Sequence, residues 1–256
     1  MAPNDVEVAV SQPQRRAPRP LLPPAARRPA ALILAACVLV TAFLGALFAH
    51  HTQPGWLDAA IDTRLGHSIF AHWWLLRRAS ILGSPHPMAM MTAALVLACL
   101  VTRRWRGVLL VLIAVPAAEV VTEYLLKPLV GRMLHGYLAF PSGHTTGVFT
   151  LAAVVTLLLT GPLRPRMPVA ARLVLVVAAY LIASTTAMVM IAMDAHYFTD
   201  TVGGAAVATG AALATALTID KLAGPQGQRA AAMGIAGAGF PGNRRGGSPE
   251  IAESGG

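Results

Sequence analysis

Charged side chains are scarce in this 256-residue chain, and lysine is almost missing. Only 12% of its residues are Asp, Glu, Lys or Arg, whereas soluble domains carry roughly 25%. Too few charges are present to cover a surface that faces water on all sides. The two lysines stand against 18 arginines, so a lysine beside a candidate site calls for a specific explanation.

Cysteine is equally rare. The two cysteines, Cys37 and Cys99, lie inside apolar segments and have no partner at the spacing of metal ligands. We expect both to pack as small apolar residues, and they give no indication of the redox compartment.

Long uncharged segments are what the chain has in abundance, and hydrophobic residues make up 55% of it. About 20 helical residues at 1.5 Å each cross the ~30 Å hydrocarbon layer of a bilayer. The sequence therefore predicts an all-α, polytopic membrane bundle of about six transmembrane helices. The expected spans are 30–49, 79–102 with the helix starting near Pro87, 107–126, 145–161, 173–193 and 201–219.

The first apolar segment could instead be a secretory signal. It is longer than the usual 7–15 apolar residues of a signal peptide, and a long tail precedes it. A retained anchor helix is the favoured interpretation, while cleavage stays open.

The two ends of the chain differ from its middle. Residues 1–29 hold seven prolines and five arginines, and 223–256 are rich in glycine, so both are predicted to be disordered cytoplasmic tails. The membrane domain is expected to occupy 30–222. Within it, the tryptophans and scattered charges of 50–78 favour a segment that lies at the membrane interface.

The net charge of +9 does not indicate nucleic-acid binding, because the basic residues occur in short runs between apolar segments. Cytoplasmic loops of membrane proteins are enriched in Lys and Arg. With the N-terminus in the cytoplasm, six crossings place 15 of the 20 Lys and Arg residues inside. Both termini are therefore predicted to be cytoplasmic.

Three polar clusters lie at the ends of predicted spans, and this topology places all three on the outer face. One of them is Pro141-Ser142-Gly143-His144. Ser142 is a good N-cap, and the free N–H groups of a helix N-terminus bind anions. Gly143 permits close approach of an oxyanion, and His144 can exchange a proton near neutral pH. An ordinary capped helix with an interfacial histidine is the alternative.

Another cluster contains His196 and Asp200. Residues four apart share a helical face, so the Asp200 carboxylate is expected to accept the Nδ1 proton of His196. The Nε2 atom of His196 would then act as a nucleophile or base. By itself, a His/Asp pair at this spacing is a weak indication.

The remaining cluster supplies cations, Lys127 and Arg132. A phosphate needs positive partners, and each charge-assisted hydrogen bond contributes roughly 1.5–3 kcal/mol. Glu119 and Glu123 precede Lys127 by eight and four residues, so the three form one helical stripe. Since acidic residues within a span are usually paired, we expect both glutamates to orient the cations rather than to contact substrate.

Together the clusters resemble the type 2 phosphatidic acid phosphatase superfamily, the lipid phosphate phosphatases, over roughly residues 79–220. That family shows a Lys…Arg-Pro motif, then Pro-Ser-Gly-His, then Ser-Arg…His…Asp. The resemblance implies a metal-independent phosphatase without a cofactor, acting on a lipid phosphate in the bilayer. It also implies that His196 attacks phosphorus to form a phosphohistidine, Asp200 orients it, and His144 protonates the leaving group. Lys127, Arg132, Ser142 and Gly143 would hold the phosphate oxygens.

Two departures from the family pattern stand out. The third motif has Met190 where the family has arginine, and Lys127 and Arg132 are five residues apart rather than seven, with no Arg-Pro pair. His135, Arg77 or Arg78 could compensate for the missing cation.

The expected substrates are a polyprenyl pyrophosphate, phosphatidate, phosphatidylglycerol phosphate or a phosphorylated lipid-linked sugar. The alternatives are a non-catalytic member that binds or moves lipid, and a phosphotransferase with an acceptor other than water. The residue bias suggests a GC-rich bacterium, hence a plasma-membrane protein with its site facing outward. The oligomeric state is open.

Overall fold

The computed structural model describes residues 20–69, 73–161 and 167–224. The chain divides into two compact units, Met1–Asp220 and Lys221–Gly256. Most of the two predicted tails, 1–29 and 223–256, lies outside the described residues.

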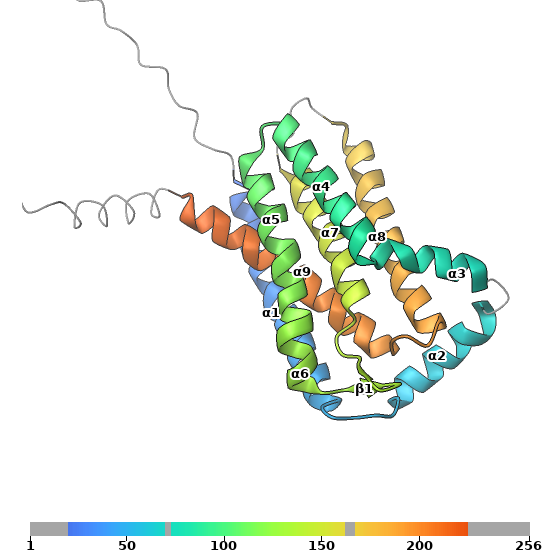
Figure 1. The fold of residues 1–256 in the computed structure, drawn as a ribbon. Helices are drawn as coiled ribbons and strands as arrows, with labels where there is room; N and C mark the ends of the chain where they lie inside the picture. The colour runs from blue at the N-terminus through green and yellow to red at the C-terminus, as the bar shows by residue number, and fades with distance from the viewer. Residues whose placement is uncertain (1–19, 70–72, 162–166, 225–256) are drawn as a thin grey trace, which may run out of the picture. The chain divides into compact units, whose positions relative to one another are not determined.

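Helices make up nearly all of the described chain (Figure 1). They are α1 (Pro24–Leu47), α2 (Trp56–Ile69), α3 (Trp73–Ser80), η2 (Ile81–Gly83), α4 (Pro85–Val101), α5 (Trp105–Val120), η3 (Val121–Leu126), α6 (Lys127–Val130), α7 (Gly143–Thr160), α8 (Val169–Ala192) and α9 (Phe198–Leu222). A two-stranded hairpin, β1 (Met133–Leu134) and β2 (Tyr137–Leu138), lies between α6 and α7.

Among the described residues, five helical segments are long and apolar enough to cross a membrane, and α4 is a shorter apolar sixth. The prediction of an all-α bundle with about six spans is confirmed. Large apolar side chains are exposed on the outer faces of these helices, as lipid contact requires; examples are Leu32, Phe43, Leu173 and Leu181.

Prolines set several helix starts close to the expected positions. A proline at the first helical turn loses no hydrogen bond, because the N–H groups there have no intrahelical partner. α4 accordingly begins at Pro85, near the expected Pro87. α1 begins at Pro24, inside the segment that we expected to belong to the tail.

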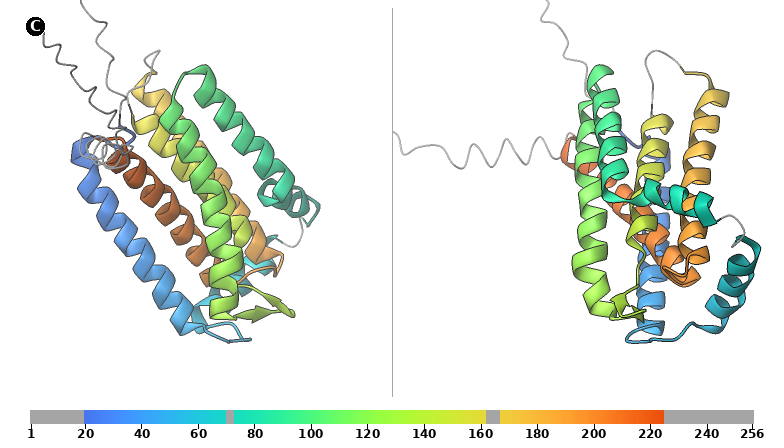
Figure 2. Two further views of the ribbon diagram at one scale, coloured as in Figure 1. Left: turned by 60° about the vertical axis from the view of Figure 1, so that its left-hand side comes forward. Right: turned by 45° about the vertical axis from the view of Figure 1, so that its right-hand side comes forward.

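Small residues allow the helices to approach closely. One apolar core joins residues of α1, α4, α5, α7 and α9, including Ala30, Cys99, Leu110, Val154 and Ala212. Cys37 and Cys99 both lie on helices in apolar surroundings, and neither is in a disulfide. α1 and α9 run side by side (Figure 2), where a Cβ added at Gly210 would lie 3.5 Å from the Cβ of Cys37.

The span that begins with the α-helix α5 continues as a π-helix, η3, near its end. Pro128 has no N–H to donate to the preceding turn, and η3 just before it is a π-helix, in which Lys127 N donates to the Thr122 carbonyl. Such widened turns are frequent at functional sites. Glu123 lies within this π-helix and Lys127 directly follows it, whereas Glu119 lies on the regular part of the helix.

One end of the bundle collects the polar clusters. α6, the hairpin, the start of α7 and the turn between α8 and α9 lie there (Figure 1), whereas the turn containing Arg103 and Arg104 lies at the opposite end. The expectation that the three clusters share a face therefore agrees with the arrangement of the helices.

Candidate active site

Ser142 caps the helix that follows it. Its backbone is extended, and its side chain accepts from Thr145 N at 3.4 Å, which confirms the predicted N-cap. Ser142 N in turn donates to the carbonyl of Asp200 at 3.0 Å. The N-termini of α7 and α9 are thereby joined, and the Ser142–His144 segment is brought beside His196.

His196 is held by a backbone carbonyl. Its Nδ1 lies 3.0 Å from Ala139 O, and the side chain is only 8% exposed. Because a carbonyl only accepts, Nδ1 carries the proton, which leaves a lone pair on Nε2. This is the tautomer that a nucleophilic histidine needs.

Asp200 does not make the predicted hydrogen bond. Its Oδ2 lies 3.8 Å from His196 Nδ1, which is too long. The carboxylate accepts instead from Tyr197 N at 3.0 Å, reaching back over the first turn of α9 as in a capping box. The structure therefore corrects the expected contact: Ala139 fixes the tautomer, and Asp200 holds the backbone that carries His196.

Arg132 does not line the cavity that holds the histidines. Its guanidinium is fully buried, with 2.6 Å ion pairs to Asp58 and Asp200. It also lies over the rings of Phe48 and Tyr197, at 4.0 and 4.3 Å from their centroids. The structure therefore also corrects the expected contact of Arg132 with phosphate. The guanidinium is paired with Asp58 and Asp200 inside the protein, and it does not line the cavity.

Lys127 does face the cavity. Its Nζ lies 2.7 Å from both carboxylate oxygens of Glu123, as expected for a glutamate that orients the lysine. The Glu123 carboxylate also lies directly against Gly143, where a Cβ would clash with Oε1. Glycine at position 143 therefore leaves room for the Glu123 carboxylate of η3 at the start of α7.

Glu119 lies one turn farther along the same groove. No partner of its carboxylate is found among the described residues, and a Cβ added at Gly147 would lie 3.0 Å from Oε1. It is thus on the cavity wall without orienting either cation.

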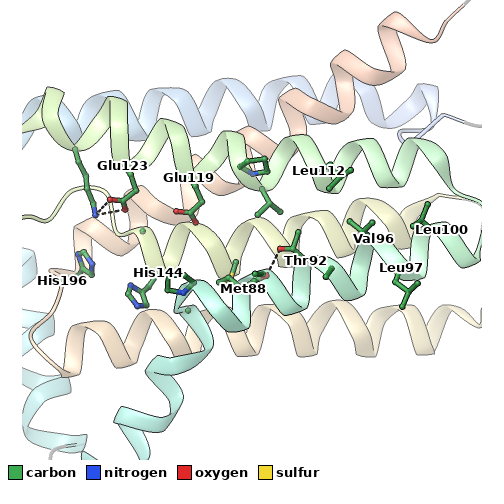
Figure 3. Close-up of a pocket in the computed structure, with 18 residues that line it drawn as sticks. Met88, Thr92, Val96, Leu97, Leu100, Leu112, Glu119, Glu123, His144 and His196 are labelled. Atoms are coloured by element: carbon green, nitrogen blue, oxygen red, sulfur yellow. Dashed lines mark hydrogen bonds and ion pairs between the residues drawn. The ribbon is translucent and has the colours of Figure 1, made fainter.

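These side chains share one cavity of about 1080 Å³. Lys127, Gly143, His144 and His196 line its polar end, and Figure 3 shows both imidazoles there. The cavity continues between α4 and α5 over an apolar surface formed by Met88, Val96, Leu97, Leu100, Leu112 and Val115, among others. Ser142 is completely buried and supports this end from behind.

Cations are few around the cavity. Lys127 is the only one among its lining residues in the described part of the chain. The position six before His196 is Met190, and the one seven after Lys127 is Leu134; both are buried. His135 pairs with Asp194 at 2.8 Å, away from the lining, and Arg77 and Arg78 are exposed on α3 and do not line it. No compensating cation is found among the residues that the structure describes.

The possible ligands for a metal are also dispersed. No group of three or more His, Cys, Asp or Glu side chains that could hold a metal ion is found in ranges 20–69, 73–161 and 167–224.

Sequence reasoning missed two contributors to the site. Asp58 on α2 is fully buried and receives hydrogen bonds from Thr199 N and Arg132. Its only signal in the sequence was an acidic residue in a segment rich in tryptophan. Ala139 acts through its carbonyl, which no side-chain pattern reveals.

Residues 126–223 match the PAP2 superfamily. This match places the segment that contains all three polar clusters in the PAP2 superfamily. The structure resembles the crystal structure of a transmembrane PAP2-type phosphatidylglycerolphosphate phosphatase from Bacillus subtilis, with a TM-score of 0.57 and 15% sequence identity. The alignment covers 71% of this chain and 93% of that protein. No curated protein matches the chain significantly.

Five long apolar helices are present among the described residues, and the protein is an integral membrane protein. The PAP2 match begins at Leu126, so it includes all three clusters but excludes α4 and α5. The apolar wall of the cavity therefore comes largely from outside the matched segment.

Proposed function

We propose that this PAP2 protein hydrolyses a phosphate or pyrophosphate monoester of a membrane lipid through a phosphohistidine. The observation that carries the proposal is the single cavity, in which His144, His196 and Lys127 lie at one end of an apolar groove. Lipid phosphatase activity in general is what PAP2 membership supports. The substrate, the intermediate and the outward orientation belong to the proposal.

The groove between α4 and α5 would take the lipid chain. α4 has 17 residues and therefore extends ~25 Å at 1.5 Å per residue. Its cavity-facing side chains run from Met88 beside the histidines to Leu100 near the far end. A chain lying in this groove would place its head group at His144 and His196.

The chemical steps follow from the two histidines. His196 Nε2 attacks phosphorus, forming an N–P bond while the P–O bond to the lipid breaks. His144, protonated at the start, donates its proton to the leaving oxygen. Water then attacks the phosphohistidine, gives its proton to His144 and releases phosphate and His196. Lys127 and the Gly143 amide would stabilise the charge on the phosphate oxygens.

Phosphate release by the purified protein in lipid nanodiscs, with EDTA present, tests this proposal. The panel would contain phosphatidate, phosphatidylglycerol phosphate, a polyprenyl pyrophosphate and a phosphorylated lipid-linked sugar. We expect His196→Ala to lower kcat by at least about 10³-fold, as removal of a nucleophile does in other enzymes, and to abolish acid-labile labelling by ³²P-substrate.

The matched control is His86→Ala, because His86 is exposed at the start of α4 and does not line the cavity. It should retain wild-type turnover. Undiminished turnover in His196→Ala, or none in the wild type on every substrate, would count against the proposal.

A non-catalytic lipid-binding role is the second candidate. Leu134 and Met190 favour it, because both positions of the expected arginines are apolar and buried. Binding of a lipid phosphate without phosphate release or labelling would select this alternative.

A further inference from the structure

A carboxylate lies close to the place where the sequence predicts a bound phosphate. The sequence predicts a phosphate at the N-terminus of α7, beside Lys127. In the structure the Glu123 carboxylate lies against Gly143, and both its oxygens lie 2.7 Å from Lys127 Nζ (Figure 3). A carboxylate is well suited to a helix N-terminus, which stabilises negative charge.

A phosphate and Glu123 cannot both occupy this place. Each would need the same Lys127 ammonium, which is the only cation lining the cavity within the described residues. Two like charges at contact distance repel each other. One of them must therefore leave when the other binds.

Glu123 is able to leave. Its side chain is 37% exposed, whereas that of Lys127 is 16% exposed. Rotation away from Gly143 would keep the carboxylate in the open part of the cavity, so it need not enter the apolar core. The neighbouring π-helix is a segment in which the regular hydrogen-bond ladder is already altered.

We propose that Glu123 is an internal competitor for the phosphate position, displaced by substrate and returning to help expel inorganic phosphate. This inference rests on the proposed function, because it assigns Glu123 to the phosphate position of the same cavity. It makes Glu123 a residue that sets the affinity for oxyanions, beyond orienting Lys127. In the empty site it also keeps the ammonium aimed at the α7 N-terminus.

Binding of orthovanadate and inorganic phosphate to the detergent-solubilised protein tests the inference. Melting temperatures are recorded over a ligand titration, since a ligand stabilises the protein according to its concentration relative to Kd. We expect Glu123→Gln, which keeps the shape and removes the charge, to lower the Kd for both anions by about tenfold or more.

Glu119→Gln is the matched control. It removes the same charge from the same cavity wall, but Glu119 contacts neither Lys127 nor Gly143 in the described structure. Its effect on Kd should be several times smaller. Equal effects of the two substitutions would mean a general field effect and would overturn the inference.

If Glu123→Gln fails to fold, Glu123→Asp replaces it as the test. The shorter side chain retains the charge but withdraws from Gly143, so anion binding should still tighten. An unchanged or weaker affinity in the folded variant would overturn the inference and leave Glu123 as a partner of Lys127 only.

The readout separates this inference from the phosphatase proposal. Tighter vanadate binding in a protein without turnover would support the inference and contradict the proposed function. Normal turnover with unchanged vanadate binding would do the reverse.

Discussion

Two cations that are five residues apart in the sequence end in opposite environments. Arg132 is completely buried and has carboxylate partners on both sides, each at 2.6 Å. Lys127 faces the cavity and has one partner, Glu123, which is itself partly exposed. A cation whose carboxylate partners are all buried stabilises the fold, whereas a cation with a displaceable partner can bind a ligand.

The framework role of Arg132 explains how the histidine end of the cavity is built. Asp58 comes from α2 and Asp200 from α9, so the guanidinium connects segments that are remote in the sequence. Asp200 also accepts from Tyr197 N, next to His196. The position of the proposed nucleophile therefore depends on a charge network that never meets the substrate cavity.

Removing the buried cation should give the largest effect. Arg132→Met leaves the Asp58 and Asp200 carboxylates buried without their partner, and breaking such a pair destabilises a protein by about 3–5 kcal/mol. We expect a clear fall in the melting temperature of the detergent-solubilised protein. Arg77→Met, at an exposed arginine of α3, should leave it unchanged. A variant that melts like wild type but binds vanadate more weakly would place Arg132 in the site after all.

Removing the cavity cation should act on chemistry instead. Lys127→Met deletes a charge-assisted contact to phosphate, and a loss of 1.5–3 kcal/mol lowers kcat/KM by about 10- to 100-fold. The melting temperature should change much less than in Arg132→Met, because the Lys127 ion pair is partly exposed. The comparison between the two cations fails if both variants lose stability to the same degree.

Features that depend on local sequence could be predicted, whereas contacts between remote segments could not. Apolar runs and prolines set the helices, so the six spans and the Ser142 cap could be predicted from local chemistry. The shared end of the three clusters followed from counting crossings. The partners of Arg132 could not be predicted, because spacing along a helix says nothing about contacts with α2 or with aromatic rings.

The contacts of His196 with Ala139 and of Glu123 with Gly143 could not be predicted from the sequence, for two further reasons. Ala139 holds His196 through its backbone, which a hairpin places there and no residue type indicates. Glu123 reaches Gly143 from a π-helix, so the simple four-residue stripe described only its pairing with Lys127.

The smallest expected effect concerns Asp62, at the edge of the Arg132 network. Burial, with the negative charge of Asp58 as the next cause, raises the pKa of Asp62 to about 7, although Phe198 N donates a hydrogen bond to its carboxylate. The folded protein thus holds a proton here that the unfolded chain releases near pH 4. This contribution to stability is complete below about pH 4 and is lost as the pH rises through about 7.

Asp62→Asn should remove that pH dependence, because the amide oxygen can still accept from Phe198 N and no charge develops. Melting temperatures of wild type and variant should be similar near pH 4 and diverge toward pH 8, with the variant higher. The divergence should be small, since Asp62 is only half-buried and water screens its charge. A wild type that gains stability relative to the variant between these pH values would reverse the sign and show that Arg132 stabilises the Asp62 anion as well as its two direct partners.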